Sequence, residues 1–205
     1  MDKDINNNGF GYVDLGLPSS TLWATCNVGA SKPSDYGLYF QWGDIVGYTK
    51  DQVGIGKGKK RFGTDWSDDN WRWKDVIKYT TKSATLELEF DAAHINMGGD
   101  WHMPSTAQIQ ELIDNATSTW EEMDGVKGIL FTSTKDTSKS IFIPAAGDAW
   151  NSLVGGIGIY GGIWSSMLNE DYIYKAAKYL FFDSSGANIG NNHYSDGLSI
   201  RGVIG

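Results

Sequence analysis

The chain has 205 residues, and its nine Trp, ten Tyr, eight Phe and 26 Gly are many for this length. Such a length suits one domain with a sizeable core, and the large rings and glycines together indicate a loop-rich fold rather than a helical bundle. The formal net charge of −8 argues against nucleic acid or an anionic membrane as the main partner, because basic faces bind both. Cys26 is the only cysteine, which excludes an internal disulfide and a Cys-cluster metal site.

The sequence carries no visible targeting signal. Its opening residues, MDKDINNNGF, lack the apolar region of a signal peptide. No stretch approaches the roughly 18 consecutive apolar residues of a membrane helix. We therefore expect no membrane insertion. If the protein works outside a cell, we expect it to leave by lysis, through a dedicated secretion machine or after removal of a signal.

Short strands are the first predicted elements. From Tyr12 to Ala30 the sequence indicates strands broken by Gly-Leu-Pro and Ser-Ser turns, with Leu22 and Trp23 in the core. Large apolar side chains then recur at every second position, which predicts a half-buried strand. These side chains belong to Tyr36, Leu38, Phe40 and Trp42.

From Gly43 to Arg72 the sequence follows no regular pattern, and we interpret this part as a long exposed excursion within a predicted insertion at about residues 43–85. Its piece from Gly54 to Lys60 lacks the spacing of a phosphate loop and is interpreted as a mobile loop. A group of acidic and amide side chains could offer oxygens to Ca²⁺, but it does not match an EF-hand, so a solvated turn is the alternative. The group consists of Asp65, Asp68, Asp69 and Asn70.

A helix and a hairpin are predicted in the middle of the chain. Ser105 and Gln108 have the spacing of a capping box, and apolar residues follow at helical spacing until about Ala116. Beyond this helix, the segments from Ile129 to Thr134 and from Ser140 to Ile143 predict two antiparallel strands around a polar turn.

The glycine-rich segment from Gly155 to Gly162 formally matches a dinucleotide-binding fingerprint. It lacks the preceding strand and the following helix that this motif needs, so we interpret it as a flexible loop that delivers Trp164 to the core. Further on, Leu180 and Phe182 alternate with other rings, which predicts a strand with one buried face.

Three blocks of the chain, taken in order, resemble a known family. The first, YVDLGLPSSTLWATCNVGA with DYGLYFQWGD, begins at Tyr12, and the second is GGDWHMPSTAQIQELI. The third combines IFIPAAG, GGIWSSML and GLSIRG, which reaches Arg201. Together they resemble the major paralogous domain of gut-associated bacteria, a branch of the C-type lectin-like fold close to the formylglycine-generating-enzyme type.

The resemblance implies an α+β fold, with a twisted antiparallel sheet, two helices and long loops on one side. It implies one domain over residues 1–205, with a binding segment of variable type at about residues 169–196. Proteins of this shape mostly bind rather than catalyse. The enzyme branch uses active-site cysteines, which this chain lacks beyond Cys26, and the calcium and sugar motifs of ordinary C-type lectins are missing too. We therefore expect no enzyme activity, no cofactor and no metal.

The C-terminal segment resembles the variable regions that diversity-generating retroelements randomise by replacing adenines. Most residues between the fixed positions are of types that an AAC codon reaches when only its adenines change, whereas Lys175 and Lys178 do not fit. The fixed positions are Ala177, Leu180, Phe182, Gly197, Ser199 and Arg201. The candidate ligand-binding residues are Tyr172, Ile173, Tyr174, Tyr179, Phe181, Asn188, Ile189, Gly190, Asn191, Asn192, His193, Tyr194, Ser195 and Asp196.

Diversified positions have to face solvent, because changes in a core are costly. We therefore expect Tyr172 and Tyr194 to be exposed, so that replacing both with Ala weakens ligand capture and leaves the melting temperature nearly unchanged. A solvated loop without any binding role is the alternative for the same composition.

The sequence thus favours a non-enzymatic binding protein whose partner is a protein or glycan on a cell surface. A phage receptor-binding protein or a bacterial surface adhesin fits, located on a virion or at a cell surface, and the oligomeric state is left open. The alternatives are a structural or assembly domain of a surface appendage and an enzyme derived from the formylglycine-generating branch.

The three histidines give no catalytic pattern. Only His193 lies in the predicted binding segment, and no Gly-x-Ser-x-Gly nucleophile elbow is present. His102 is interpreted as structural. A metal site made of His94, His102 and a nearby carboxylate would need the two histidines to converge, and the sequence leaves this open.

Overall fold

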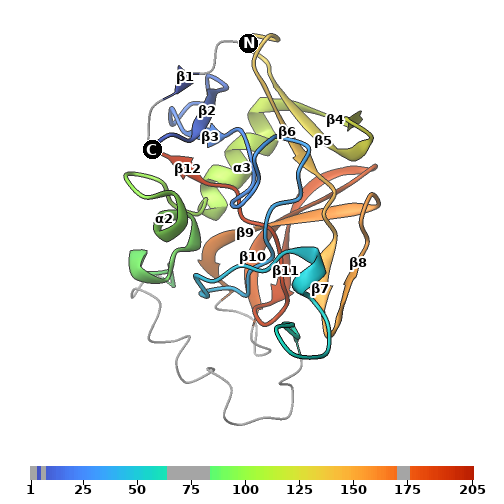
Figure 1. Cartoon of the computed structure of the whole chain (residues 1–205). Coiled ribbons are helices and arrows are strands. Elements are labelled where there is room, and N and C mark those ends of the chain that lie inside the picture. Colours follow the sequence, from blue (N-terminus) through green and yellow to red (C-terminus); the bar gives the residue numbers. More distant parts are fainter. Residues whose placement is uncertain (1–3, 6–7, 64–83, 170–175) are drawn as a thin grey trace.

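The computed structural model describes residues 4–5, 8–63, 84–169 and 176–205 (Figure 1). The predictions for the acidic group at residues 65–70 lie outside these ranges. So do those for Tyr172, Ile173 and Tyr174.

The two ends of the described chain meet in one sheet. Its strands stand in the order β1 (Asp4–Ile5), β2 (Gly11–Asp14), β3 (Leu22–Ala24) and β12 (Val203–Ile204). The last strand pairs antiparallel with β3, and the two lie side by side in Figure 1. The predicted short strands are thus confirmed, and Trp23 is buried while Leu22 is half-buried.

The predicted helix is confirmed with its cap. The two α-helices of the described residues are α2 (Ala92–Met97) and α3 (Thr106–Asn115), beside the 3₁₀ turns η1 (Lys50–Gln52) and η3 (Leu88–Phe90). Ser105 accepts a hydrogen bond from the backbone N–H of Gln108, and the Gln108 side chain returns one, which completes the capping box. The helix buries Ile109 and Leu112, and it ends at Asn115, with Ala116 as its C-cap.

The predicted hairpin is part of a three-stranded antiparallel sheet. Its strands are β4 (Ala116–Met123), β5 (Val126–Ser133) and β6 (Ser140–Pro144), in that order. Strand β4 was not predicted, although the dipeptide Asp124-Gly125 between β4 and β5 is the strongest short hairpin signal. Both residues have the positive φ that such a turn requires, 52° and 79°.

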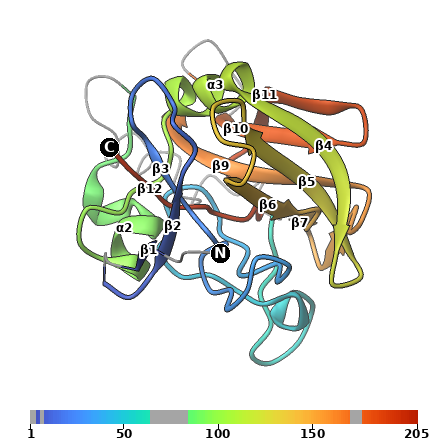
Figure 2. The ribbon, with the colours of Figure 1, turned by 90° about the horizontal axis from the view of Figure 1, so that it is seen from above.

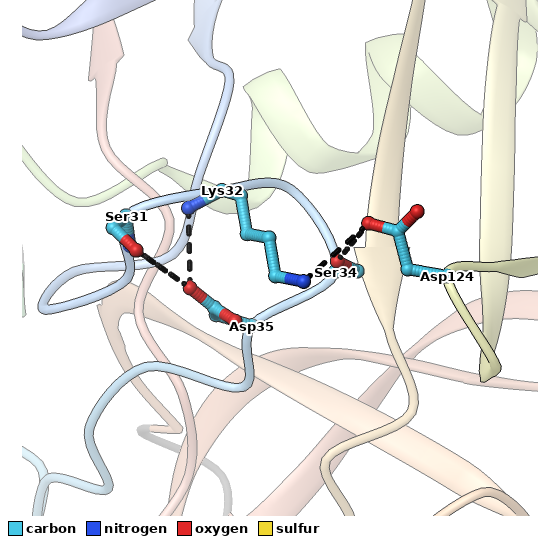
Figure 3. A network of polar contacts seen from close by, with 5 residues as sticks. All are labelled: Ser31, Lys32, Ser34, Asp35 and Asp124. Carbon is cyan, nitrogen blue, oxygen red and sulfur yellow. Dashed lines mark hydrogen bonds and ion pairs between the residues drawn. The ribbon is translucent and has the colours of Figure 1, made fainter.

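The β4–β5 turn is tied to an exposed loop near the N-terminus (Figure 3). Ser34 donates a hydrogen bond of 2.8 Å to Asp124, and Lys32 forms an ion pair of 3.6 Å with the same carboxylate. Because both charged side chains are more than half exposed, the pair contributes little to stability.

The third sheet carries the candidate site. It has the strand order β11 (Gly186–His193), β10 (Ala176–Asp183) and β9 (Tyr160–Leu168), and the hairpin of β7 (Asp148–Trp150) and β8 (Leu153–Gly155) precedes it. We call the face that contains Leu180 and Phe182 the inner face; it packs against α3, β5 and β6 (Figure 2). The predicted strand with one buried face is therefore confirmed.

Two predictions for the chain near this sheet are wrong. The segment from Tyr36 to Trp42 forms no regular strand, only isolated bridges of Tyr39 to Tyr48 and of Phe40 to Leu198. Both sides of it are buried, because Phe40 and Trp42 enter one core cluster while Tyr39 enters another.

The glycine-rich segment is likewise not one loop, since it spans the end of β8, a turn and the start of β9. It does deliver Trp164 to the core, as predicted, and the indole N–H of Trp164 donates to the carbonyl of Phe40 at 2.8 Å. The described part of the 43–85 region is also not wholly exposed: Phe62 is fully buried against Tyr39.

A buried arginine joins the main parts of the described chain. The guanidinium of Arg201 donates to Asn27 Oδ1, to the Ala24 carbonyl and to the Phe142 carbonyl, each at 2.9 Å. No carboxylate pairs with it among the described residues, and burial lowers the pKa of Arg201 to about 10. The described residues thus form an α+β arrangement of antiparallel sheets and two helices, cross-linked by one buried cation.

We expect Arg201→Ala to lower the free energy of unfolding by at least about 3 kcal/mol, because three buried acceptors lose their donor at roughly 1–3 kcal/mol each. Urea unfolding measures this. The matched control is Arg61→Ala, since Arg61 is exposed and its guanidinium donates, within the described ranges, to the Asn151 side chain alone. Equal losses in the two variants would contradict the role of Arg201.

Candidate ligand-binding face

The candidate site lies on the outer face of the β9–β10–β11 sheet, which is the face opposite Leu180 and Phe182. Tyr179 pairs with Gly190 on one side and with Trp164 on the other, while Phe181 pairs with Asn188 and Gly162. Directly opposed residues share a face of a sheet. The register therefore brings Tyr179, Phe181, Asn188 and Gly190 together on the outer face.

Three half-buried rings form the centre of the outer face. The ring of Tyr179 lies across a floor of two glycines, because a Cβ added at Gly190 or Gly162 would come within 2.6 or 3.0 Å of it. Phe181 lies 6.3 Å from Tyr179 and 6.0 Å from Tyr160, measured between ring centroids. The fully buried Trp164, which pairs with Tyr179 on the neighbouring strand, lies 6.0 Å from the Tyr179 ring. The rings are thus held in place by the backbone beneath them and by each other.

Polar side chains border these rings. Asn188 is exposed, while Asn192, which lies two residues beyond Gly190 on the same face, is half-buried. Asn191 is exposed on the other side of β11, opposite Lys178. Ile189 faces inward and packs against the core cluster of the inner face, so it cannot contact a ligand on the outer face.

The predicted exposure of three further residues is wrong. Tyr194, Ser195 and Asp196 are only 1%, 2% and 8% exposed. Strand β11 ends at His193, after which the chain turns inward, and the Ser195 carbonyl accepts hydrogen bonds from Gln41 Nε2 and the Gly63 N–H. The buried part of the C-terminal segment therefore begins directly after His193, so Tyr194, Ser195 and Asp196 belong with the core.

The three histidines form no metal-ion cluster within the described residues. His193 Nδ1 lies 2.6 Å from the hydroxyl of Ser195, which is buried. The rings of His94 and His102 contact backbone carbonyls, those of Trp101 in one case and of Met103 and Gly205 in the other. In the described ranges no three His, Cys, Asp or Glu side chains come close enough to hold a metal ion.

Two carboxylates beside the rings were missed as a pair by the sequence analysis. Asp148 accepts a hydrogen bond of 2.6 Å from the hydroxyl of Tyr160. Asp196 Oδ1 is buried and has no hydrogen-bond partner among the described residues. Burial raises the pKa of Asp196 to about 7, and the charge of Asp148 adds to the rise. Burial likewise raises the pKa of Tyr179 to about 12, with the same two carboxylates contributing.

No protein-family model matches the chain, and neither the curated proteins nor the solved structures with which it was compared contain a match. None of the helices in the described part of the chain is long and apolar enough to cross a membrane.

Tyr194→Ala is expected to lower the free energy of unfolding by roughly 3–5 kcal/mol, because it empties a core position between large side chains. Asn191→Ala, on the exposed side of the same segment, is the control and should stay within about 0.5 kcal/mol of the wild type. Chemical denaturation of both variants checks this. If Tyr194→Ala were as stable as the control, the burial of Tyr194 would be contradicted and the predicted exposure of its ring would be supported.

The buried carboxyl of Asp196 predicts a pH dependence of stability. Its folded-state pKa of about 7 lies above the unfolded value of about 3.9, so the folded state binds the proton more tightly. The stability from this proton is fully present below about pH 4 and is lost as the pH rises through 7. We expect Asp196→Asn to match the wild type at pH 4 and to be more stable at pH 8, by up to about 4 kcal/mol.

Urea titrations of both proteins at the two pH values measure this difference. A stability difference between Asp196→Asn and the wild type that is the same at pH 4 and pH 8 would contradict the raised pKa.

Proposed function

We propose that the protein is a non-enzymatic binding protein whose outer face contacts a protein or glycan on a cell surface. The observation that carries this proposal is the row of three half-buried rings, Tyr160, Tyr179 and Phe181, in which Tyr179 lies over two glycines and amide side chains border the row. The inner face of the same sheet is core, so the rings stand on a packed support.

The chemistry of this face suits recognition. Aromatic rings with few rotatable bonds supply contact area at a low entropic cost, whereas Asn side chains adapt their hydrogen bonds to different partners. The rings of the outer face restrict one another's positions, so little conformational freedom remains to be lost on binding. The proposal places the binding energy in the rings and the specificity in the amides around them.

The C-type lectin-like fold and its location on a virion or at a cell surface belong to the same proposal. Both rest on the resemblance of the three sequence blocks, and the α+β arrangement with two helices is compatible with the fold. A phage receptor-binding protein and a bacterial adhesin share this mode of action.

Diversification of the outer face by a retroelement is a further part of the proposal. Changes at the exposed Asn188 of the outer face would cost little stability, as would changes at Asn191 on the other side of β11, whereas changes at the buried Tyr194 would cost much. We therefore expect a template repeat near the gene, with AAC codons at the positions that correspond to the exposed residues. A reverse transcriptase gene should lie beside this repeat. Gene sequencing tests this, and a neighbourhood without a template repeat would leave an undiversified adhesin.

An assembly domain is the second candidate function, and one surface feature favours it. Trp150 and Leu153 pair across the β7–β8 hairpin and are 54% and 70% exposed, and Ile159 nearby is 68% exposed. Exposed apolar groups of this kind often contact partner subunits.

Binding of fluorescently labelled protein to a glycan array and to a panel of intact bacterial cells tests the primary proposal. We expect Phe181→Ala to weaken binding at least tenfold, because central aromatic residues dominate interfaces. Phe10→Ala is the matched control, since Phe10 is an exposed ring away from the outer face. Equal binding by the two variants would contradict the proposal.

A further inference from the structure

The carboxylates of Asp148 and Asp196 lie next to the aromatic row of the outer face. Asp148 stands on β7 and is joined to Tyr160 of β9 by their hydrogen bond, and both carboxylates are close enough to Tyr179 of β10 to raise its pKa. Two elements distant in sequence, β7 and the turn after β11, thus place negative charge beside the rings.

The carboxyl group of Asp196 lacks hydrogen-bond partners among the described residues. Its side chain makes no hydrogen bond with the described residues, and only its Oδ1 atom is completely buried, so Oδ2 keeps some contact with solvent. A Cβ added at Gly63 would lie 2.7 Å from Oδ1 and 2.8 Å from Cδ1 of Trp150. Gly63 therefore lies directly against the orphaned oxygen, and the edge of the half-exposed Trp150 indole lies against the same glycine.

The basic groups near this pair are engaged elsewhere. Lys60 Nζ donates to Gln41 Oε1 at 2.7 Å and lies over the rings of Tyr48 and Phe62. Arg61 Nη2 donates to the Asn151 side chain at 2.8 Å. Within the described residues, no ion pair joins Asp148 or Asp196 to a cation. Two neighbouring carboxylates, one lacking a hydrogen bond, are therefore left to repel each other.

We infer that Asp148 and Asp196 form a subsite for the ammonium or guanidinium group of a lysine or arginine side chain of a protein ligand. A cation there cancels the repulsion between the carboxylates, and its N–H groups supply the donor that Asp196 lacks. The rings of Trp150 and Tyr160 offer apolar and cation–π contact to the stem and head of such a side chain. This inference rests on the proposed function and deepens it, because it selects a protein with an exposed basic residue over a neutral glycan.

The donor set fits an organic cation better than Ca²⁺. Calcium takes six to eight oxygen ligands, whereas the described residues offer two carboxylates here, one of which already accepts the Tyr160 hydroxyl. An ammonium group needs only two or three acceptors within hydrogen-bond distance.

Nuclear magnetic resonance titration with Nα-acetyl-L-lysine methylamide at pH 8 tests the inference, with the uncharged norleucine analogue and CaCl₂ as comparisons. We expect saturable shifts of the Trp150 indole and Asp196 amide signals at millimolar concentrations of the lysine derivative. Asp196→Asn should weaken this binding at least tenfold, and Asp136→Asn, which alters an exposed carboxylate in the β5–β6 turn, should leave it unchanged.

Binding should also weaken at pH 5.5, at least fivefold, because Asp196 then holds a proton. The titratable groups that face Asp196 are Asp148, Tyr160 and Tyr179 from the neighbouring strands, and His193 lies on the same turn. The phenols stay neutral at both pH values, since burial raises the pKa of each. A gain of positive charge on His193 would also weaken binding of a cation. Any pH dependence of binding that remains in Asp196→Asn measures this contribution of His193.

Three results would overturn the inference: equal binding of the norleucine analogue, stronger shifts with CaCl₂, or unchanged binding in Asp196→Asn. The cell-binding assay keeps this separate from the proposed function. If Phe181→Ala abolishes cell binding and Asp196→Asn does not, the cation subsite fails and the function stands. If the lysine derivative binds through Asp196 while neither variant alters cell binding, the function fails and the subsite stands.

Discussion

The guanidinium of Arg201 is the constraint on which the rest of the described structure depends. Taking a cation out of water is costly unless its donors are satisfied, and here neutral acceptors from β3, the loop after it and β6 accept one hydrogen bond from each of its three nitrogens. The acceptors and the arginine must therefore be assembled together. This fixes the path of the C-terminal segment, whose Leu198 and Ser199 bridge to Phe40 and to Ile163 of β9.

Because the path of the C-terminal segment is fixed, the β9–β10–β11 sheet has a packed inner face and a partly open outer face. The inner face is packed against α3, β5 and β6, and the buried end of the outer face is covered by Trp42, Tyr194 and Leu198. What remains open is the region of Tyr160, Tyr179 and Phe181, with β11 along its side. A surface supported in this way can change its exposed residues without disturbing the core.

The elements that the sequence predicted best are those determined by interactions between residues close in sequence. The α3 helix followed from its capping box, and β10 followed from the alternation of Leu180 and Phe182. The strand predicted from Tyr36 to Trp42 failed because contacts distant in sequence bury both of its sides. Contacts distant in sequence also bury Tyr194. Its burial was not predicted, because the neighbouring residues give no sign that the chain turns inward after His193.

The outer face was predicted in part, and of its charged edge only Asp196 was predicted, without its neighbour Asp148. Tyr179, Phe181, Asn188 and Asn192 were chosen for their residue types, and the strand register does bring them to one face. Asp148 and Tyr160 had no local signal, because only the sheet topology brings β7 and β9 next to the turn after β11. Pairings of this kind depend on long-range backbone contacts that residue patterns do not encode.

Carbene footprinting of the protein bound to the intact cells that it recognises tests the central claim most directly. The account predicts reduced labelling at Tyr179, Phe181 and Asn188, with labelling of the N-terminal sheet unchanged. Unchanged labelling of the outer face, together with protection of Trp150 and Leu153 alone, would contradict it and favour an assembly contact through the β7–β8 hairpin.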